Sequence, residues 1–364
     1  MGGSAHTERL ERVRDAMAAD GVEALLLGPG ANLRWLAGYH ALPLERLTLL
    51  VVPVAGDPAL VVPELEAARA QASPAIGIAH LLTWGETDDP DAIVADLVPA
   101  ADRVAVDDRL WTSFTLRLQR RLEVGRWTVA SDLLGPLRQV KDEAELGALA
   151  AAGAAIDHVH ERVPSLLRAG RTEREVAADI AAEIRATHDE VAFVIVASGP
   201  NGASAHHEPD DRRLEVGDAV IVDIGGILDA YCSDETRNYH LGPPSAEYAQ
   251  LHVTLEAAQR AGVDAVRVGA AAQQVDRAAR GVLRDAGLDQ FFVHRTGHGI
   301  GLDEHEEPWI VEGNEQPLRA GMTFSVEPGV YVPGRHGARI EDIVAVTPGV
   351  AEPFNHRPHE LTVI

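Results

Sequence analysis

Four acidic residues and one histidine in the second half of the chain have side chains that commonly bind divalent metal ions. In chain order they are Asp223, Asp234, His298, Glu327 and Glu341. Three of the acids stand within or directly after apolar, strand-like runs, where a lone buried carboxylate is costly unless its charge is compensated. A hairpin that turns within residues 225–229 would bring the first two acids together, and adjacent anions repel unless a cation lies between them. The pattern therefore indicates a cation site.

Three histidines, His294, His298 and His305, lie within twelve residues, among glycines that let backbone approach a site closely. A glycine-rich phosphate loop is the alternative, but the segment has neither the dinucleotide-binding nor the P-loop spacing. Each residue taken singly also has a structural interpretation, such as an ion pair between Asp234 and Arg237. Together, four carboxylates and one imidazole favour Mn²⁺, Co²⁺ or Zn²⁺. Four carboxylates fit two ions that share bridging acids better than they fit one.

The elements that must position these residues are predicted to form two domains. Strand-like and helix-like segments alternate in residues 1–135, which predicts an α/β domain. Residues 136–364 combine helices with mostly antiparallel strands, which predicts an α+β domain. The expected helices there are 143–168, 173–187, 245–262 and 271–286, and the expected strands are 191–196, 219–224, 323–326 and 340–346. Thr172 and Glu175 predict a capping box at the start of the second helix.

The composition excludes several classes of function. The 364 residues include 32 Lys+Arg and 56 Asp+Glu, a net charge of −24, so neither nucleic acid nor an anionic membrane surface is an expected partner. Cys232 is the single cysteine, which excludes an intramolecular disulfide and a zinc–thiolate site. No apolar run approaches the roughly 20 residues of a membrane span, and residues 1–6 lack a signal-peptide pattern. We therefore expect a cytoplasmic protein.

The order Asp, Asp, His, Glu, Glu resembles the pita-bread metallopeptidase family, which includes methionine aminopeptidase, aminopeptidase P and prolidase. The segment 32–39, Asn-Leu-Arg-Trp-Leu-Ala-Gly-Tyr, resembles the creatinase-type N-terminal domain that some members carry. The resemblance implies a creatinase-like α/β domain in residues 1–135 and a pita-bread α+β catalytic domain in residues 136–364. It also implies two divalent metal ions, with Mn²⁺ expected first and Co²⁺ or Zn²⁺ as alternatives.

The resemblance further implies a role for each of the five ligands. Asp223 would hold one ion, Asp234 and Glu341 would bridge both, and His298 and Glu327 would complete the second site. The ions would activate a water molecule for attack on the scissile carbonyl. Glu327 would act as general base and proton shuttle by family analogy.

Two further histidines match catalytic positions of the family. His305 and His206 would stabilise the tetrahedral intermediate and hold the proline side of the substrate. The choice between His206 and its neighbour His207 is open by one residue, and the spacing from Asn201-Gly202 favours His206. His294 matches another histidine position of aminopeptidase P.

Three arginines are candidates for binding the substrate carboxylate: Arg295, Arg335 and Arg339. Arg339 also matches an arginine that orients metal-binding carboxylates in the family. The usual Thr-Arg-Thr after the second aspartate is Thr236-Arg237-Asn238 here, a departure that affects no predicted ligand.

The function that the resemblance implies is that of an Xaa-Pro dipeptidase, a prolidase, acting on peptides that end in proline. Aminopeptidase P, which acts on longer Xaa-Pro peptides, is the alternative within the family. A non-catalytic pita-bread binding protein is the alternative of another class, and the five intact ligands argue against it. The presence of residues 1–135 argues against methionine aminopeptidase. Family habit implies a homodimer in which a neighbouring N-terminal domain closes the active site.

Overall fold

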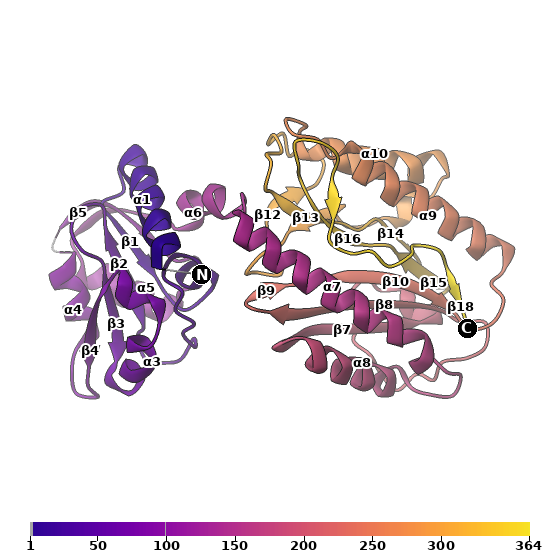
Figure 1. The fold of residues 1–364 in the computed structure, drawn as a ribbon, viewed down its shortest axis with the longest axis horizontal. Helices are drawn as coiled ribbons and strands as arrows, with labels where there is room; N and C mark the ends of the chain where they lie inside the picture. The colour runs from indigo at the N-terminus through magenta and orange to yellow at the C-terminus, as the bar shows by residue number, and fades with distance from the viewer. Residues whose placement is uncertain (1–2, 99) are drawn as a thin grey trace. The chain divides into compact units, whose positions relative to one another are not determined.

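The computed structural model describes residues 3–98 and 100–364, which form two compact units, Met1–Arg138 and Gln139–Ile364. Figure 1 shows both units, with the first in indigo and purple. In the described part of the chain, no helix combines the length and the apolar character that crossing a bilayer requires.

The first unit is built on one mixed six-stranded sheet with the strand order β4-β3-β2-β1-β5-β6. Its strands are β1 (Ala24–Leu27), β2 (Leu49–Pro53), β3 (Ala59–Pro63), β4 (His80–Trp84), β5 (Ala101–Val106) and β6 (Val124–Val129). Its helices are α1 (Gly3–Asp20), α2 (Ala31–Ala37), α3 (Ala67–Gln71), α4 (Pro90–Leu97), α5 (Thr112–Arg121) and α6 (Ser131–Arg138). β1 is parallel to β5 and antiparallel to β2. The residues of β1 are buried on both faces, as a central strand covered by helices requires.

The second unit contains two larger sheets and a hairpin. Its first sheet has the strands β7 (Glu190–Ser198), β8 (Ala219–Leu228), β9 (Tyr231–Cys232), β10 (Glu235–His240) and β18 (Thr362–Val363). Its second sheet has β11 (Gly297–Gly299), β12 (Glu306–Ile310), β13 (Thr323–Val326), β16 (Asp342–Ala345) and β17 (Glu352–Pro353). The hairpin pairs β14 (Gly329–Val332) with β15 (His336–Arg339).

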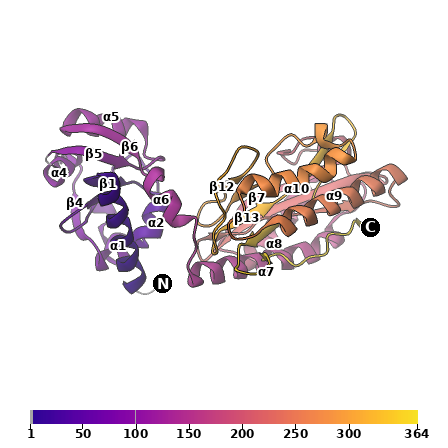
Figure 2. The same cartoon turned by 90° about the horizontal axis from the view of Figure 1, so that it is seen from above.

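Two pairs of helices cover these strands from either side, as Figure 1 shows. They are α7 (Glu143–Leu166) with α8 (Glu173–Thr187), and α9 (Ala246–Ala265) with α10 (Ala272–Asp285). α7 contacts β8 and α8 contacts β7, whereas α9 contacts β13 and α10 contacts β12. Figure 2 shows α9 and α10 running side by side, where they contact each other along their length. The strands of the second unit therefore lie between two helical layers.

Local capping sets the starts of the first helix pair. Asp142 and Glu145 cap α7 reciprocally, and Thr172 and Glu175 do the same for α8. The predicted capping box at Thr172 is thus confirmed. Beneath these helices, the buried aliphatic residues of α7 and α8 form one cluster with β8 residues such as Val222. The sheet that carries the first acids is therefore fixed from behind by a continuous apolar layer.

Candidate metal centre

A cavity of about 310 Å³ lies within the second unit and collects most of the residues singled out from the sequence. All five predicted ligands line it: Asp223, Asp234, His298, Glu327 and Glu341. Five of the other predicted residues line it as well: His206, His294, His305, Arg295 and Arg339. The remaining lining residues are Phe193, Ile195, Ala205 and Glu304. Residues from six separated segments of the chain thus converge on one cavity.

A β-hairpin positions the first two acids. Asp223 lies in the middle of β8 opposite Thr236, and Asp234 directly precedes β10. The hairpin turns at Asp229 and Ala230, both with positive φ, and not within the predicted residues 225–229 alone. Gly225 and Gly226 lie inside β8. A Cβ at Gly225 would lie 2.4 Å from the Phe193 ring and one at Gly226 would lie 2.5 Å from the His188 ring, so only glycine fits at these two positions. These glycines serve close packing, which their sequence context did not distinguish from a turn.

The histidine and the two glutamates come from the second sheet and its edges. His298 lies in β11, and its Nε2 is 3.7 Å from Asp234 Oδ2 and 3.4 Å from Glu327 Oε1. Glu327 directly follows β13, whereas Glu341 stands between β15 and β16 and bridges to Thr236 of β10. One ligand atom each of Asp234, His298 and Glu341 lies within 4.8 Å of the other two. That spacing permits all three to contact one metal ion.

Three carboxylates of this cluster each have one buried oxygen without a hydrogen-bond partner in the described part of the chain. In the described residues, Asp223 Oδ1, Asp234 Oδ1 and Glu341 Oε1 are buried without a hydrogen-bond donor. Buried polar atoms are nearly always paired, so three unpaired carboxylate oxygens in one cavity call for a missing partner. A divalent cation supplies that partner and neutralises the acids at once. The residues present therefore fit a metal centre.

The pKa values in the metal-free chain reflect the same crowding. Burial, and then the charge of Glu341, raise the pKa of Asp234 well above its usual range. Burial, and then the charge of Glu327, do the same to the pKa of Glu341. Burial raises the pKa of Glu327 to about 7 and lowers the pKa of His298 to about 3. His298 is therefore a neutral imidazole, the form that binds metals.

Arg339 and Thr236 donate hydrogen bonds to two of the carboxylates, those of Asp223 and Glu341. The Arg339 guanidinium donates to Asp223 Oδ2, to the Tyr331 hydroxyl at 2.7 Å and to Thr236 Oγ1 at 3.1 Å. Thr236 Oγ1 in turn donates to Glu341 Oε2 at 2.7 Å. Asp223 and Glu341 are thereby linked to one arginine, Asp223 directly and Glu341 through Thr236.

Tyr331 also connects Arg339 to His294. His294 Nδ1 donates to the Arg295 carbonyl at 2.7 Å, so its Nε2 accepts from the Tyr331 hydroxyl at 2.9 Å. Burial lowers the pKa of His294 to about 3, which agrees with this neutral tautomer. Tyr331 was not among the residues predicted from the sequence. The signal that could have identified it is a tyrosine within an apolar strand, because a buried hydroxyl needs a hydrogen-bond partner.

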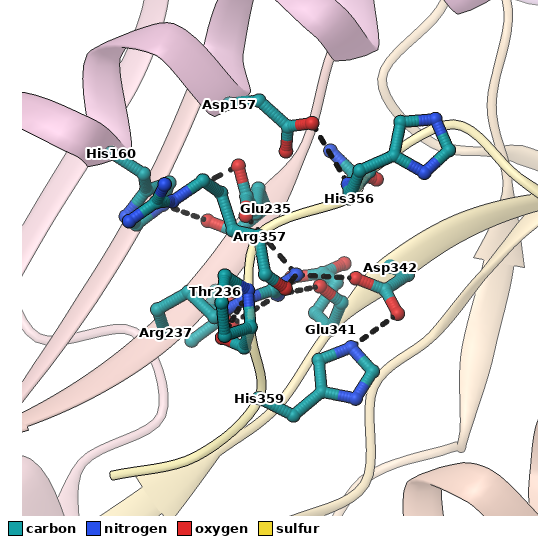
Figure 3. A network of polar contacts seen from close by, with 12 residues as sticks. Asp157, His160, Glu235, Thr236, Arg237, Glu341, Asp342, His356, Arg357 and His359 are labelled. Atoms are coloured by element: carbon teal, nitrogen blue, oxygen red, sulfur yellow. Dashed lines mark hydrogen bonds and ion pairs between the residues drawn. The ribbon is translucent and has the colours of Figure 1, made fainter. Parts of the chain in front are cut away.

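A second arginine, Arg237, binds the backbone of Glu341, as Figure 3 shows. Arg237 donates to the Glu341 carbonyl at 2.6 Å and to Asp342 Oδ1 at 2.7 Å, and its Nη2 is 3.2 Å from Glu235 Oε1. His359 Nε2 lies 2.7 Å from the other Asp342 oxygen. The ion pair of Asp234 with Arg237, offered as the structural interpretation, is wrong, because Arg237 pairs with these other acids.

The structure separates the two neighbouring histidines of the loop that follows β7. His206 lines the cavity, whereas His207 Nε2 lies 2.7 Å from Glu173 Oε2 at the start of α8. Glu173 is fully buried and also accepts from the Ser198 backbone amide at 2.7 Å.

His305 lies next to the predicted ligand His298, and the centroids of the two rings are 4.0 Å apart.

The three candidate arginines occupy different surroundings. Arg295 lines the cavity, with its guanidinium carbon 4.1 Å from the centre of the Trp309 ring. Arg339 is bound to Asp223 as described. Arg335 is half-exposed, pairs with Glu247 at 2.7 Å, and is absent from the cavity lining formed by the described residues.

Comparisons with known proteins identify the family of the chain. Residues 147–348 match the model of metallopeptidase family M24, and residues 9–140 match that of the Creatinase/Prolidase N-terminal domain. The chain is 50% identical over 363 residues to the probable dipeptidase PepE of Mycobacterium tuberculosis, covering 99% of this chain and 96% of that protein.

Solved structures extend the similarity to the whole fold. The dipeptidase PepE of Mycobacterium ulcerans superposes with a TM-score of 0.95 at 52% identity, covering 100% of this chain and 99% of that one. A prolidase from Thermococcus sibiricus superposes with a TM-score of 0.92 at 33% identity, covering 99% of each chain. These similarities confirm the predicted fold class, a creatinase-like α/β domain followed by a pita-bread α+β domain. The chain therefore belongs to metallopeptidase family M24, as a peptidase of the dipeptidase and prolidase type.

Proposed function

We propose that this protein is an Xaa-Pro dipeptidase that uses two divalent metal ions. The observation that carries the proposal is the cluster of four carboxylates and one imidazole in a single cavity, with three buried carboxylate oxygens that lack a donor. Four acids exceed the need of one ion and suit two ions with shared ligands. The similarity to a solved prolidase supports proline as the preferred residue after the scissile bond.

The five residues would hold the ions in a defined order. Asp223 would bind one ion, Asp234 and Glu341 would bridge both, and His298 and Glu327 would complete the second. Oxygen donors with a single imidazole favour Mn²⁺, with Co²⁺ or Zn²⁺ as alternatives. When bound, the ions supply a polarised scissile carbonyl and a water of lowered pKa.

Glu327 is the residue of this chain best suited to move the proton of the attacking water. Its side chain is 13% exposed, and its Oε1 accepts a hydrogen bond from Ser325 Oγ at 3.1 Å, which fixes the carboxylate at the cavity wall. A carboxylate held at the cavity wall, within reach of a water molecule between the ions, can accept its proton and pass it on.

His305 and His206 would donate to the oxygen that becomes negative as the peptide bond is attacked. Both line the cavity outside the ligand cluster, and His305 lies beside the ligand His298. Burial lowers the pKa of His305, so it acts as a neutral donor. Donors already placed at the wall stabilise developing charge without reorganisation.

Arg295 is the best candidate to bind the carboxylate of a C-terminal proline. Trp309 stacks on the face of its guanidinium, whereas a carboxylate binds along the edge. Arg339 already donates to Asp223, and Arg335 already pairs with Glu247 outside the cavity. A dedicated carboxylate site explains why a dipeptide would be preferred, because a longer chain leaves the partly buried Arg295 cation without its partner.

The test compares hydrolysis of Xaa-Pro with that of Xaa-Pro-Yaa and Xaa-Ala by protein loaded with Mn²⁺. We expect Xaa-Pro to be cleaved fastest. Faster cleavage of Xaa-Pro-Yaa would make the protein an aminopeptidase P, and equal cleavage of Xaa-Ala would remove proline from the proposal. Two metal equivalents per chain without hydrolysis of any peptide would indicate a binding protein of this fold.

A further inference from the structure

The cavity contains one carboxylate that the proposed metal centre does not use. Five acids line the cavity, and four of them belong to the ligand cluster. The fifth, Glu304, stands in the turn between β11 and β12, and its side chain is 35% exposed. Glu304 is not one of the five predicted ligands, although its charge acts on Asp234 and that of Asp223 acts on it. Glu304 is thus a cavity-lining anion to which the proposed metal centre assigns no role.

The surroundings of Glu304 do not compensate its charge fully. Its Oε1 lies 3.5 Å from His305 Nδ1, and its side chain is only about one third exposed. A partly desolvated carboxylate in this position gains from any cation that enters the cavity.

The same cavity offers an apolar surface on β7. Phe193 and Ile195 line it, and Ile195 lies directly opposite Asp223 in the sheet. A cavity that offers both an apolar surface and a carboxylate suits a side chain with a long aliphatic stem and a charged head. Lysine and arginine have this form, whereas leucine would use the apolar wall alone.

We propose that Glu304 binds the cationic side chain of a lysine or arginine in the residue before the scissile bond. The preferred substrates are then dipeptides with a basic first residue, a conclusion that rests on the proposed dipeptidase activity. The α-ammonium group is a less suitable partner for Glu304. It is only two bonds from the attacked carbonyl carbon, and its position is therefore fixed by the attack, whereas a longer side chain can reach a separate carboxylate of the cavity wall.

The experiment uses lysyl-proline and norleucyl-proline, which differ in the terminal charge and little in the stem. We expect the metal-loaded protein to hydrolyse lysyl-proline with a kcat/KM about tenfold higher, the usual effect of a hydrogen bond to a charged group. Glu304→Gln should remove this preference by raising KM for lysyl-proline, with norleucyl-proline unchanged. Glu304→Lys should reverse the preference, favouring glutamyl-proline over lysyl-proline.

The matched control is Glu208→Gln, an exposed acid near His206 that does not line the cavity. It should leave the ratio of the two substrates unchanged. Equal effects of Glu304→Gln on both dipeptides, no effect on either, or loss of bound metal would each overturn the proposal. If the proposed proline specificity fails, the role of Glu304 can still be tested. Lysyl-alanine and norleucyl-alanine then replace the two proline dipeptides, and the same ratio of kcat/KM values is measured.

Discussion

Replacing Glu327 with glutamine should stabilise the metal-free protein at high pH, because the wild-type chain must bury an unpaired charge there. The pKa of Glu327 is about 7 in the folded chain against an ordinary value of 4.5. Between these pH values the folded chain keeps the proton and the unfolded chain has lost it. The stability that this difference provides is complete below pH 4.5 and is lost as the pH rises through about 7.

The size of the effect follows from the same shift. A difference of about 2.5 pKa units at 1.36 kcal/mol each corresponds to roughly 3 kcal/mol. Glutamine has the shape of the protonated acid and does not titrate. In EDTA, Glu327→Gln should therefore match the wild type near pH 4.5 and exceed it by roughly 3 kcal/mol at pH 8.

Urea unfolding followed by circular dichroism at several pH values measures the difference. Glu208→Gln, an exposed acid, is the control and should follow the wild type throughout. Saturating Mn²⁺ should reverse the order at pH 8, because the wild type binds the ion more tightly and gains more stability. A variant no more stable than the wild type at pH 8 in EDTA, or a difference independent of pH, would refute the reasoning.

Three further substitutions test the other roles. Asp234→Asn and Glu341→Ala should each lose bound metal and activity together, as measured by elemental analysis and peptide hydrolysis; two retained metal equivalents would contradict a bridging role. His305→Ala should keep both metals and lower kcat by about 10² to 10³, the usual effect of losing a transition-state donor; an unchanged kcat would make the residue structural. Arg295→Ala should raise KM for Xaa-Pro and reduce the preference over Xaa-Pro-Yaa, whereas Arg335→Ala should change neither. Equal effects of both arginine variants would argue against the assigned carboxylate site.

The sequence predicted well those features that local patterns determine. The capping box at Thr172 and Glu175 depends only on neighbouring residues, and the structure contains it. The four acids and the histidine stand in distinctive contexts in a distinctive order, and the fold brings them to one cavity. The turn of the hairpin lies at the end of the predicted range, at Asp229 and Ala230, because Gly225 and Gly226 remain in β8 and pack against rings that are remote in sequence.

The features that the sequence did not reveal depend on long-range contacts. Arg335 was one of three equivalent candidates until its pairing with Glu247, 88 residues away, placed it outside the cavity. Glu304 stands beside His305 in an unremarkable polar turn, and only the assembled cavity shows that it faces the site. The choice between His206 and His207 likewise depended on Glu173, 34 residues from His207.

The two arginines around Glu341 explain how four acids can remain close together before any metal binds. Arg339 reaches the Glu341 carboxylate through Thr236, and Arg237 holds the Glu341 backbone carbonyl from the opposite end of the residue. Each arginine also pairs with a further acid, Asp223 for Arg339 and Asp342 for Arg237. One oxygen each of Asp223 and Glu341 thereby has a donor, and the other oxygen of each has none among the described residues. A carboxylate fixed on one side and unpaired on the other is directed toward the ion before the ion arrives, so metal binding requires little reorganisation of the protein.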